Sequence, residues 1–134
     1  MKDDIIINKI EVIKRCIKRV EEEYDNNILN LENYTKQDSI ILNLQRMCEA
    51  TLDLAFHYIK MSNFEIPQTN KEAFKVLENR KIIDKDLSNN LQGMVGFRNI
   101  AVHDYQVLNL EILKNILEKH LYDSIKFSKC ILEK

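Results

Sequence analysis

Apolar residues recur at helical spacing from the start of the chain. Steps of four and three residues alternate along the series Ile6, Ile10, Ile13, Ile17, Val20 and Tyr24. Such a seam is typical of an amphipathic helix and predicts a first helix from about residue 3 to 24. Lysines and arginines flank this seam and acidic residues follow it, so charge is segregated along the helix.

Four further segments carry the same periodicity. The second helix, expected from about 36 to 61, opens at a capping box formed by Thr35 and Asp38. It is apolar on more than one side, so we expect it to lie centrally and to touch several neighbours. A short helix follows the capping signal at Thr69 and ends near residue 79, a fourth opens at Asp84 or Ser88, and a last one covers 108–132.

These patterns predict an all-α fold, an antiparallel bundle of about five helices joined by short polar links. No segment shows strand periodicity, and no internal repeat interrupts the series. At 134 residues the chain has the length of one ordinary domain, so a single domain over residues 1–134 is expected.

The amino-acid composition excludes several classes of fold and function. Two glycines and one proline are too few for the turns of an all-β fold or for a glycine-rich phosphate loop. The 20 lysines and arginines against 21 acids give a net charge of −1, so any contact with nucleic acid must come from a local patch. No apolar stretch reaches the length of a secretion signal or a membrane span, and the expected compartment is the cytoplasm, with no membrane partner.

The three cysteines favour no metal site and no disulfide framework. Cys16, Cys48 and Cys130 are widely spaced and form no C-x-x-C pair. That arrangement favours reduced structural thiols, and the sequence predicts neither a metal nor a cofactor.

An arginine interrupts the apolar stripe of the fourth helix. Leu87, Leu91 and Met94 step toward position 98, where the sequence places Arg98. Either its stem packs while its head reaches solvent or pairs with an acid, or it belongs to a functional site.

A polar pair follows this arginine. Asn99 and His103 lie about 40° apart around a helix, so the amide can orient the imidazole. Arg98 and His103 lie about 140° apart and would not meet on a straight helix. Either the helix frays near Val102, or the arginine reaches round, or a second subunit completes the site.

The run from Arg98 to Tyr105 resembles the Arg-x4-His-x-Tyr signature of HepT-type toxins. These are HEPN-domain ribonucleases encoded beside MNT-type nucleotidyltransferase antitoxins. The resemblance extends through residues 6–10, 13–19, 37–46 and 93–97 and departs nowhere from the signature.

This resemblance implies a single HepT-like helical domain that acts as the toxin of a type VII toxin–antitoxin system. It implies a homodimer whose two signatures face a shared cleft, metal-independent cleavage of RNA, either mRNA or tRNA, and a larger hetero-oligomer with the antitoxin. It also implies that the antitoxin silences the toxin by attaching AMP to Tyr105.

The chemistry of the signature residues agrees with RNA cleavage. A metal-free route uses the 2′-hydroxyl of the RNA as nucleophile, which needs a proton shuttle near neutral pH and a cation beside the phosphorane. His103 suits the first need and Arg98 the second, while Asn99 would orient His103 or bind a phosphate oxygen. One histidine cannot supply both acid and base, so two copies at a dimer cleft are expected.

Two alternatives compete with the ribonuclease interpretation. The first is a non-catalytic HEPN module that binds a nucleotide or a partner protein, and the second is a dimeric helical scaffold. The intact set of Arg98, Asn99, His103 and Tyr105 favours the enzyme, because a pure binding module has no use for an aligned imidazole. Asp104 is expected to cap the helix or form a salt bridge.

The remaining polar residues are expected to be structural. His57 and His120 have no partner by spacing, and Asp53 is treated in the same way, although it could instead face the cleft. Arg46 and the basic flank of the first helix are candidates for steering RNA, against the simpler interpretation that they form a solvated surface.

Overall fold

The computed structural model describes residues 3–134, and every regular element in this range is helical. The α-helices are α1 (Asp4–Tyr24), α2 (Tyr34–Met61), α3 (Asn70–Asn79), α4 (Lys85–His103), α5 (Leu110–Asn115) and α6 (Asp123–Leu132). Two 3-10 turns occupy Ile28–Glu32 and Tyr105–Val107, and a π turn occupies Ile116–His120. The predicted all-α bundle is confirmed.

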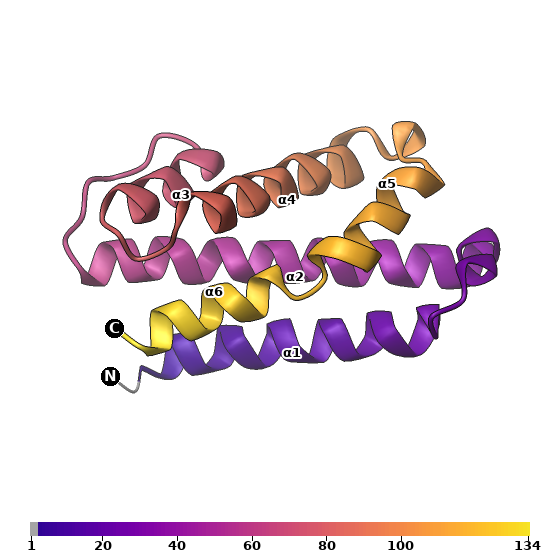
Figure 1. Cartoon of the computed structure of the whole chain (residues 1–134), viewed down its shortest axis with the longest axis horizontal. Helices are drawn as coiled ribbons and strands as arrows, with labels where there is room; N and C mark the ends of the chain where they lie inside the picture. The colour runs from indigo at the N-terminus through magenta and orange to yellow at the C-terminus, as the bar shows by residue number, and fades with distance from the viewer. Residues whose placement is uncertain (1–2) are drawn as a thin grey trace.

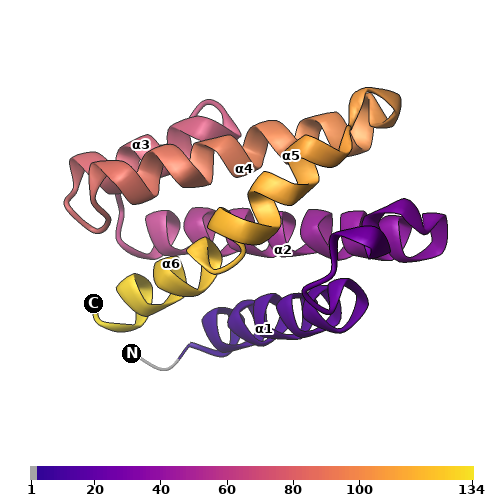
Figure 2. The same ribbon diagram turned by 45° about the vertical axis from the view of Figure 1, so that its right-hand side comes forward.

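Helix α2 lies at the centre of the arrangement. It packs against α1, α3, α4 and α6, as its apolar residues on several faces predict. Helices α1 and α4 run antiparallel to α2 on different sides of it (Figure 1), and α6 contacts all three. The turned view in Figure 2 shows the chain from α4 through α5 descending obliquely over α2 toward α1.

The predicted seams form the core. The apolar positions of α1 from Ile6 to Val20 are buried, and Ile40, Leu44 and Leu54 of α2 are fully so. Phe74 of α3 and Phe127 of α6 meet edge to face at 5.6 Å between ring centroids, a geometry that aromatic pairs favour. Helices distant in sequence therefore share one apolar interior.

The helix starts follow cap chemistry, with one correction. Thr69 and Asp84 cap α3 and α4 as expected, each accepting a backbone N–H from the residue three positions on. The capping box proposed at Thr35 is wrong, because Asn33 caps α2 and its Oδ1 accepts the N–H of Lys36. A 3-10 turn ends just before Asn33, and α2 begins at Tyr34, two residues before the predicted start at residue 36. Thr35 therefore already lies inside the helix.

The single last helix expected over 108–132 is also wrong. It is divided into α5, the π turn and α6. Leu113, Leu117 and Leu121 are all buried, yet a spacing of four rotates each about 40° past the previous one on an ideal α-helix. A wider π turn at this point keeps the three leucines on the core side.

The cysteines are free thiols, as expected. Cys16 and Cys48 are buried and Cys130 is half-buried. Burial raises the pKa of the Cys48 thiol to about 12, so this side chain is a neutral apolar group at physiological pH.

Candidate active site

The signature lies at the point where α4 ends. The helix continues through Val102 to His103 and stops because Asp104 leaves helical geometry, with φ −151° and ψ 51°. Asp104 is thus the C-cap, its N–H donating to the carbonyl of Ile100 at 2.9 Å. A 3-10 turn that begins at Tyr105 follows directly.

Arg98 is held by an acid of α2. Its Nε and Nη2 both donate to Oε2 of Glu49, each at 3.2 Å, and its Nη1 donates to Oδ1 of Asn99 at 3.3 Å. The side chains of Arg98 and Glu49 are 25% and 39% exposed. The arginine on the apolar stripe therefore packs its stem and pairs its head with an acid, while the guanidinium stays open to solvent.

His103 is exposed at the last position of α4. Among residues 3–134 no hydrogen bond reaches its ring, and the Asn99 amide that was expected to orient it bonds to Arg98 instead. Because α4 does not fray at Val102 and Glu49 holds Arg98, two of the three routes that could join Arg98 to His103 are not taken. Completion of the site by a second subunit stays a prediction.

Tyr105 is tied to the first turns of α2. Its hydroxyl donates to Oδ1 of Asp38 at 2.5 Å across 67 positions of sequence, while the residue as a whole remains 43% exposed. Partial burial, followed by the hydrogen bond and the charge of Asp38, raises the pKa of Tyr105 to about 12. At neutral pH the phenol is therefore protonated.

Sequence reasoning missed both acids that contact the signature. Asp38 and Glu49 are eleven residues apart, which places them within about 20° of one another around a helix. They form one stripe on α2, in contact with Arg98 near the end of α4 and with Tyr105 in the 3-10 turn that follows it. A search for acids sharing a helix face at this spacing would have found the pair, although not its partners.

The other histidines and Asp53 have partners within the chain. Nε2 of His57 lies 2.9 Å from Oδ2 of Asp3, and this contact holds the pKa of the Asp3 carboxyl below its usual value. Nδ1 of His120 lies 2.9 Å from Oδ2 of Asp123, whose side chain is only 3% exposed. The expectation that His120 has no partner by spacing is wrong, because Asp123 lies only three residues further along the chain.

Lys9 on the basic flank of α1 pairs with Asp53 at 3.0 Å. The remaining basic residues of that flank, together with Arg46 of α2, are exposed: Lys14, Arg15, Lys18 and Arg19. Asp53 thus has a structural partner, whereas the other cations stay open to solvent.

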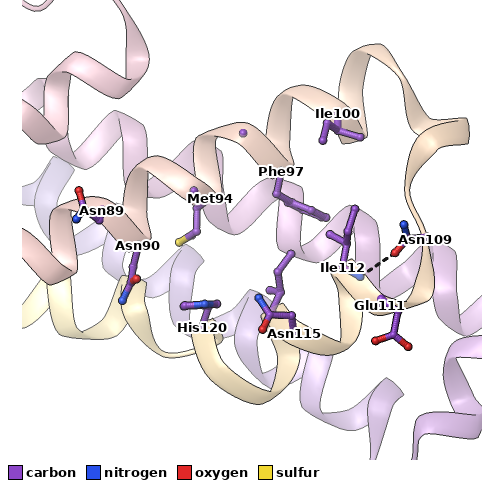
Figure 3. A pocket seen from close by; sticks show the side chains of 13 residues that line it. Asn89, Asn90, Met94, Phe97, Ile100, Asn109, Glu111, Ile112, Asn115 and His120 are labelled. Carbon is purple, nitrogen blue, oxygen red and sulfur yellow. Dashed lines mark hydrogen bonds between the residues drawn. The ribbon is translucent and has the colours of Figure 1, made fainter.

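A cavity of about 710 Å³ lies between α4 and the α5–π turn segment. Figure 3 shows Met94 and Phe97 of α4 opposite Ile112 of α5, with Asn115 and His120 at the rim of this space. Arg98, His103 and Tyr105 do not line it. The signature side chains therefore lie outside this cavity, near and just beyond the C-terminal end of α4.

The described residues 3–134 contain no candidate metal centre and no candidate membrane span. No three His, Cys, Asp or Glu side chains gather there as metal ligands could. None of the helices is at once long enough and apolar enough to cross a membrane.

Comparison with known proteins gives consistent matches over nearly the whole chain. The family model described as Ribonuclease HepT-like matches residues 6–131. The curated mRNA nuclease HepT of Shewanella oneidensis is 49% identical over 125 residues, which are 93% of this chain and 94% of that protein.

Solved structures agree with these matches. A tri-AMPylated Shewanella oneidensis HEPN toxin in complex with MNT antitoxin has a TM-score of 0.93 and 46% identity, covering 99% of this chain and 100% of that one. A toxin–antitoxin complex with AMP-PNP has a TM-score of 0.92 and 47% identity, covering 98% and 100%. The cytosolic protein of unknown function YutE from Bacillus subtilis, 14% identical with a TM-score of 0.83 over 96% and 86% of the two chains, shares the fold.

The raised pKa of Tyr105 predicts a visible difference from an ordinary tyrosine. At pH 10.0, where a free phenol is half ionised, Tyr105 should remain protonated because its pKa lies near 12. Carbon NMR of the labelled tyrosine ring carbon that bears the hydroxyl measures this directly, and Tyr105→Phe assigns the signal. The stabilising contact is present below pH 10 and is lost as the pH rises through the folded pKa. Half ionisation of Tyr105 at pH 10 would contradict the hydrogen bond to Asp38.

Proposed function

The chain belongs to the ribonuclease HepT-like family, and we propose that it is a toxin that cleaves RNA at a cleft built on Arg98 and His103. An unbroken signature within the matched residues 6–131, with its arginine held and its histidine free, is the observation that carries this proposal. The protein acts in the cytoplasm and is neutralised by an MNT-type nucleotidyltransferase. The non-catalytic alternative is not favoured, because the curated relative of 49% identity is a nuclease.

Arg98 is suited to bind the phosphate at the point of cleavage. A guanidinium has five N–H donors, of which two bond to Glu49 and one to Asn99. Two N–H groups therefore remain for the oxygens of a phosphorane, whose growing negative charge a fixed cation stabilises. Glu49 orients the group without burying it.

His103 is suited to move protons in the same step. The 2′-hydroxyl of the RNA attacks the neighbouring phosphorus, its proton passes to a base, and an acid returns a proton to the departing 5′-oxygen. One imidazole cannot hold both roles at once. We therefore propose a two-fold homodimer with α4 at its seam, in which two copies of His103 flank one phosphate.

Tyr105 is the proposed site of neutralisation. It lies two residues beyond His103 and its ring is partly exposed, so another enzyme can reach the hydroxyl. Each AMP attached there adds a negative phosphodiester, and placed beside Asp104 and the path of the RNA it repels and blocks the substrate. The related toxin in complex with MNT antitoxin is tri-AMPylated, which supports this form of control.

Substitution of the signature residues tests the catalytic proposal. His103→Ala should lower the rate of RNA cleavage by about 100- to 10,000-fold and Arg98→Ala by about 100- to 1,000-fold. Thermal unfolding should stay close to wild type for His103→Ala, since that side chain is exposed. Val102→Ala, at the exposed neighbouring position, is the matched control and should cleave normally. Two results would show the mechanism to be wrong. One is a His103→Ala variant that cleaves RNA at the wild-type rate, and the other is a wild-type protein that stops cleaving RNA when a chelator is added.

The dimer has a separate test in Gly96→Glu. Gly96 and His103 lie within about 20° of one another around α4, and a Cβ at Gly96 would meet only Nζ of Lys71, at 3.9 Å. The substitution should leave the helical content intact while two facing carboxylates separate the subunits. Sedimentation at micromolar concentration should show a wild-type dimer and a Gly96→Glu monomer without cleavage activity. A monomeric wild-type ribonuclease would contradict the proposed assembly.

Mixed dimers test whether two copies of His103 serve one phosphate. One wild-type subunit and one His103→Ala subunit, carrying different tags and purified together, should cleave far more slowly than half the wild-type rate. Half the wild-type rate would instead mean that each subunit works alone.

Mass spectrometry locates the modification. Incubation with an MNT-type nucleotidyltransferase and ATP should add AMP to the peptide that contains Tyr105 and abolish RNA cleavage, whereas Tyr105→Phe should remain unmodified and active. Tyr34 is the internal control, because at 79% exposure it is more accessible than Tyr105. AMP on Tyr34 would indicate that accessibility selects the residue and would rule out Tyr105 as the specific acceptor.

A further inference from the structure

We propose that Asp38 is the residue that positions the Tyr105 hydroxyl and takes its proton when the tyrosine oxygen accepts AMP. This inference rests on the proposed role of Tyr105 as the AMP acceptor. It assigns part of the transfer chemistry to the modified chain itself.

The contact between the two side chains is specific. Asp38 and Tyr105 come from the first turns of α2 and from the 3-10 turn after α4, and the hydroxyl donates directly to the carboxylate. In the described chain Asp38 forms no ion pair, and its carboxylate accepts no second side-chain hydrogen bond. The carboxylate of Asp38 is therefore available to accept the proton of the Tyr105 hydroxyl.

The phenol needs such a base. Burial and the neighbouring carboxylate raise the pKa of Tyr105 to about 12, so phenolate is scarce at neutral pH and the neutral oxygen is a weak nucleophile. A carboxylate within hydrogen-bond reach of the proton is the usual solution, as in protein kinases, where an aspartate accepts the proton of the substrate hydroxyl.

The step balances with ATP as the co-reactant. The oxygen of Tyr105 forms a bond to the α-phosphorus of ATP, and the bond from that phosphorus to the bridging oxygen of the pyrophosphate breaks. The electron pair of the broken bond leaves with pyrophosphate. The phenolic proton passes to Asp38, which then releases it to water.

A second tyrosine in the chain provides a matched control. The hydroxyl of Tyr122 also donates to a carboxylate, that of Glu21, and this pair lies where α1 meets the segment before α6. It repeats the chemistry of the Tyr105–Asp38 pair away from the signature. Glu21→Gln therefore removes the carboxylate that contacts Tyr122, a tyrosine with no role in the proposal.

Two substitutions at Asp38 separate positioning from proton transfer. Asp38→Asn keeps an oxygen that can accept the hydroxyl hydrogen but cannot take up the proton at neutral pH, and Asp38→Glu keeps the base. Asp38 is exposed, so both substitutions should leave the fold intact, and circular dichroism verifies this. The whole chain is incubated with the nucleotidyltransferase and ATP labelled on its α-phosphate, and the initial rate of AMP incorporation is measured.

The expected result is a loss of at least about 100-fold in Asp38→Asn, with partial recovery in Asp38→Glu and a wild-type rate in Glu21→Gln. The pH profile gives the diagnostic readout. The Asp38→Asn rate should rise about tenfold per pH unit between about pH 7 and 9, because only the phenolate then reacts, while the wild-type rate changes little.

Two outcomes would overturn the inference. One is an Asp38→Asn variant that accepts AMP at the wild-type rate. The other is a slowed variant whose pH profile matches wild type, since Asp38 would then only hold the turn in place. Mass spectrometry of the wild-type product separates these failures from failure of the proposed function. AMP on another residue would refute the role of Tyr105 itself, whereas AMP on Tyr105 with a normal Asp38→Asn rate refutes only the role of Asp38.

Discussion

Helix α2 has apolar side chains on several faces, and the only favourable place for such a helix is among the others. Helices α1, α3, α4 and α6 all pack on it. The rest of the architecture follows from covering these faces, because each neighbour contributes one apolar stripe to the common core. The stripe of α2 that bears Asp38 and Glu49 is left partly open to solvent, and the functional end of α4 lies beside it.

That open stripe organises the signature. Glu49 holds the guanidinium of Arg98 and Asp38 holds the hydroxyl of Tyr105, so one helix orients both ends of an eight-residue run. A partly exposed pair such as Glu49 and Arg98 adds little to stability, and its value lies in orientation. His103, between the two held residues, makes no hydrogen bond through its ring among the described residues.

The residues proposed for cleavage and the residue proposed for its control therefore share one surface. Arg98 and His103, the groups proposed to bind and cleave RNA, lie seven and two residues before Tyr105, the group proposed to carry AMP. A modification therefore need not unfold or rearrange the bundle to act. It changes the charge at a place where phosphate must approach. Because the whole chain has a net charge of −1, only local groups of cations can attract RNA. A few negative charges added beside such a group therefore weaken RNA binding.

The sequence alone was sufficient for much of the fold. Helix periodicity, the caps at Thr69 and Asp84, and the signature run are local patterns, because a helix face depends on residues three and four positions apart. The start of α2 was misplaced by two residues because Thr35 and Asn33 both offer a capping oxygen, and the preceding turn decides between them. The sequence pattern does not predict the π turn at Ile116–His120. The turn fits the packing of Leu117 in the core and follows from no local sequence preference.

Only the tertiary structure decided which groups meet at the site. Glu49 lies 49 positions from Arg98, and Asp38 lies 67 from Tyr105. No spacing rule links such residues, because their meeting depends on how far α2 and α4 are rotated and shifted against each other. That register is set by the packing of their buried faces. The sequence marked out the side chains of the signature, whereas the packing of the helices determined their partners.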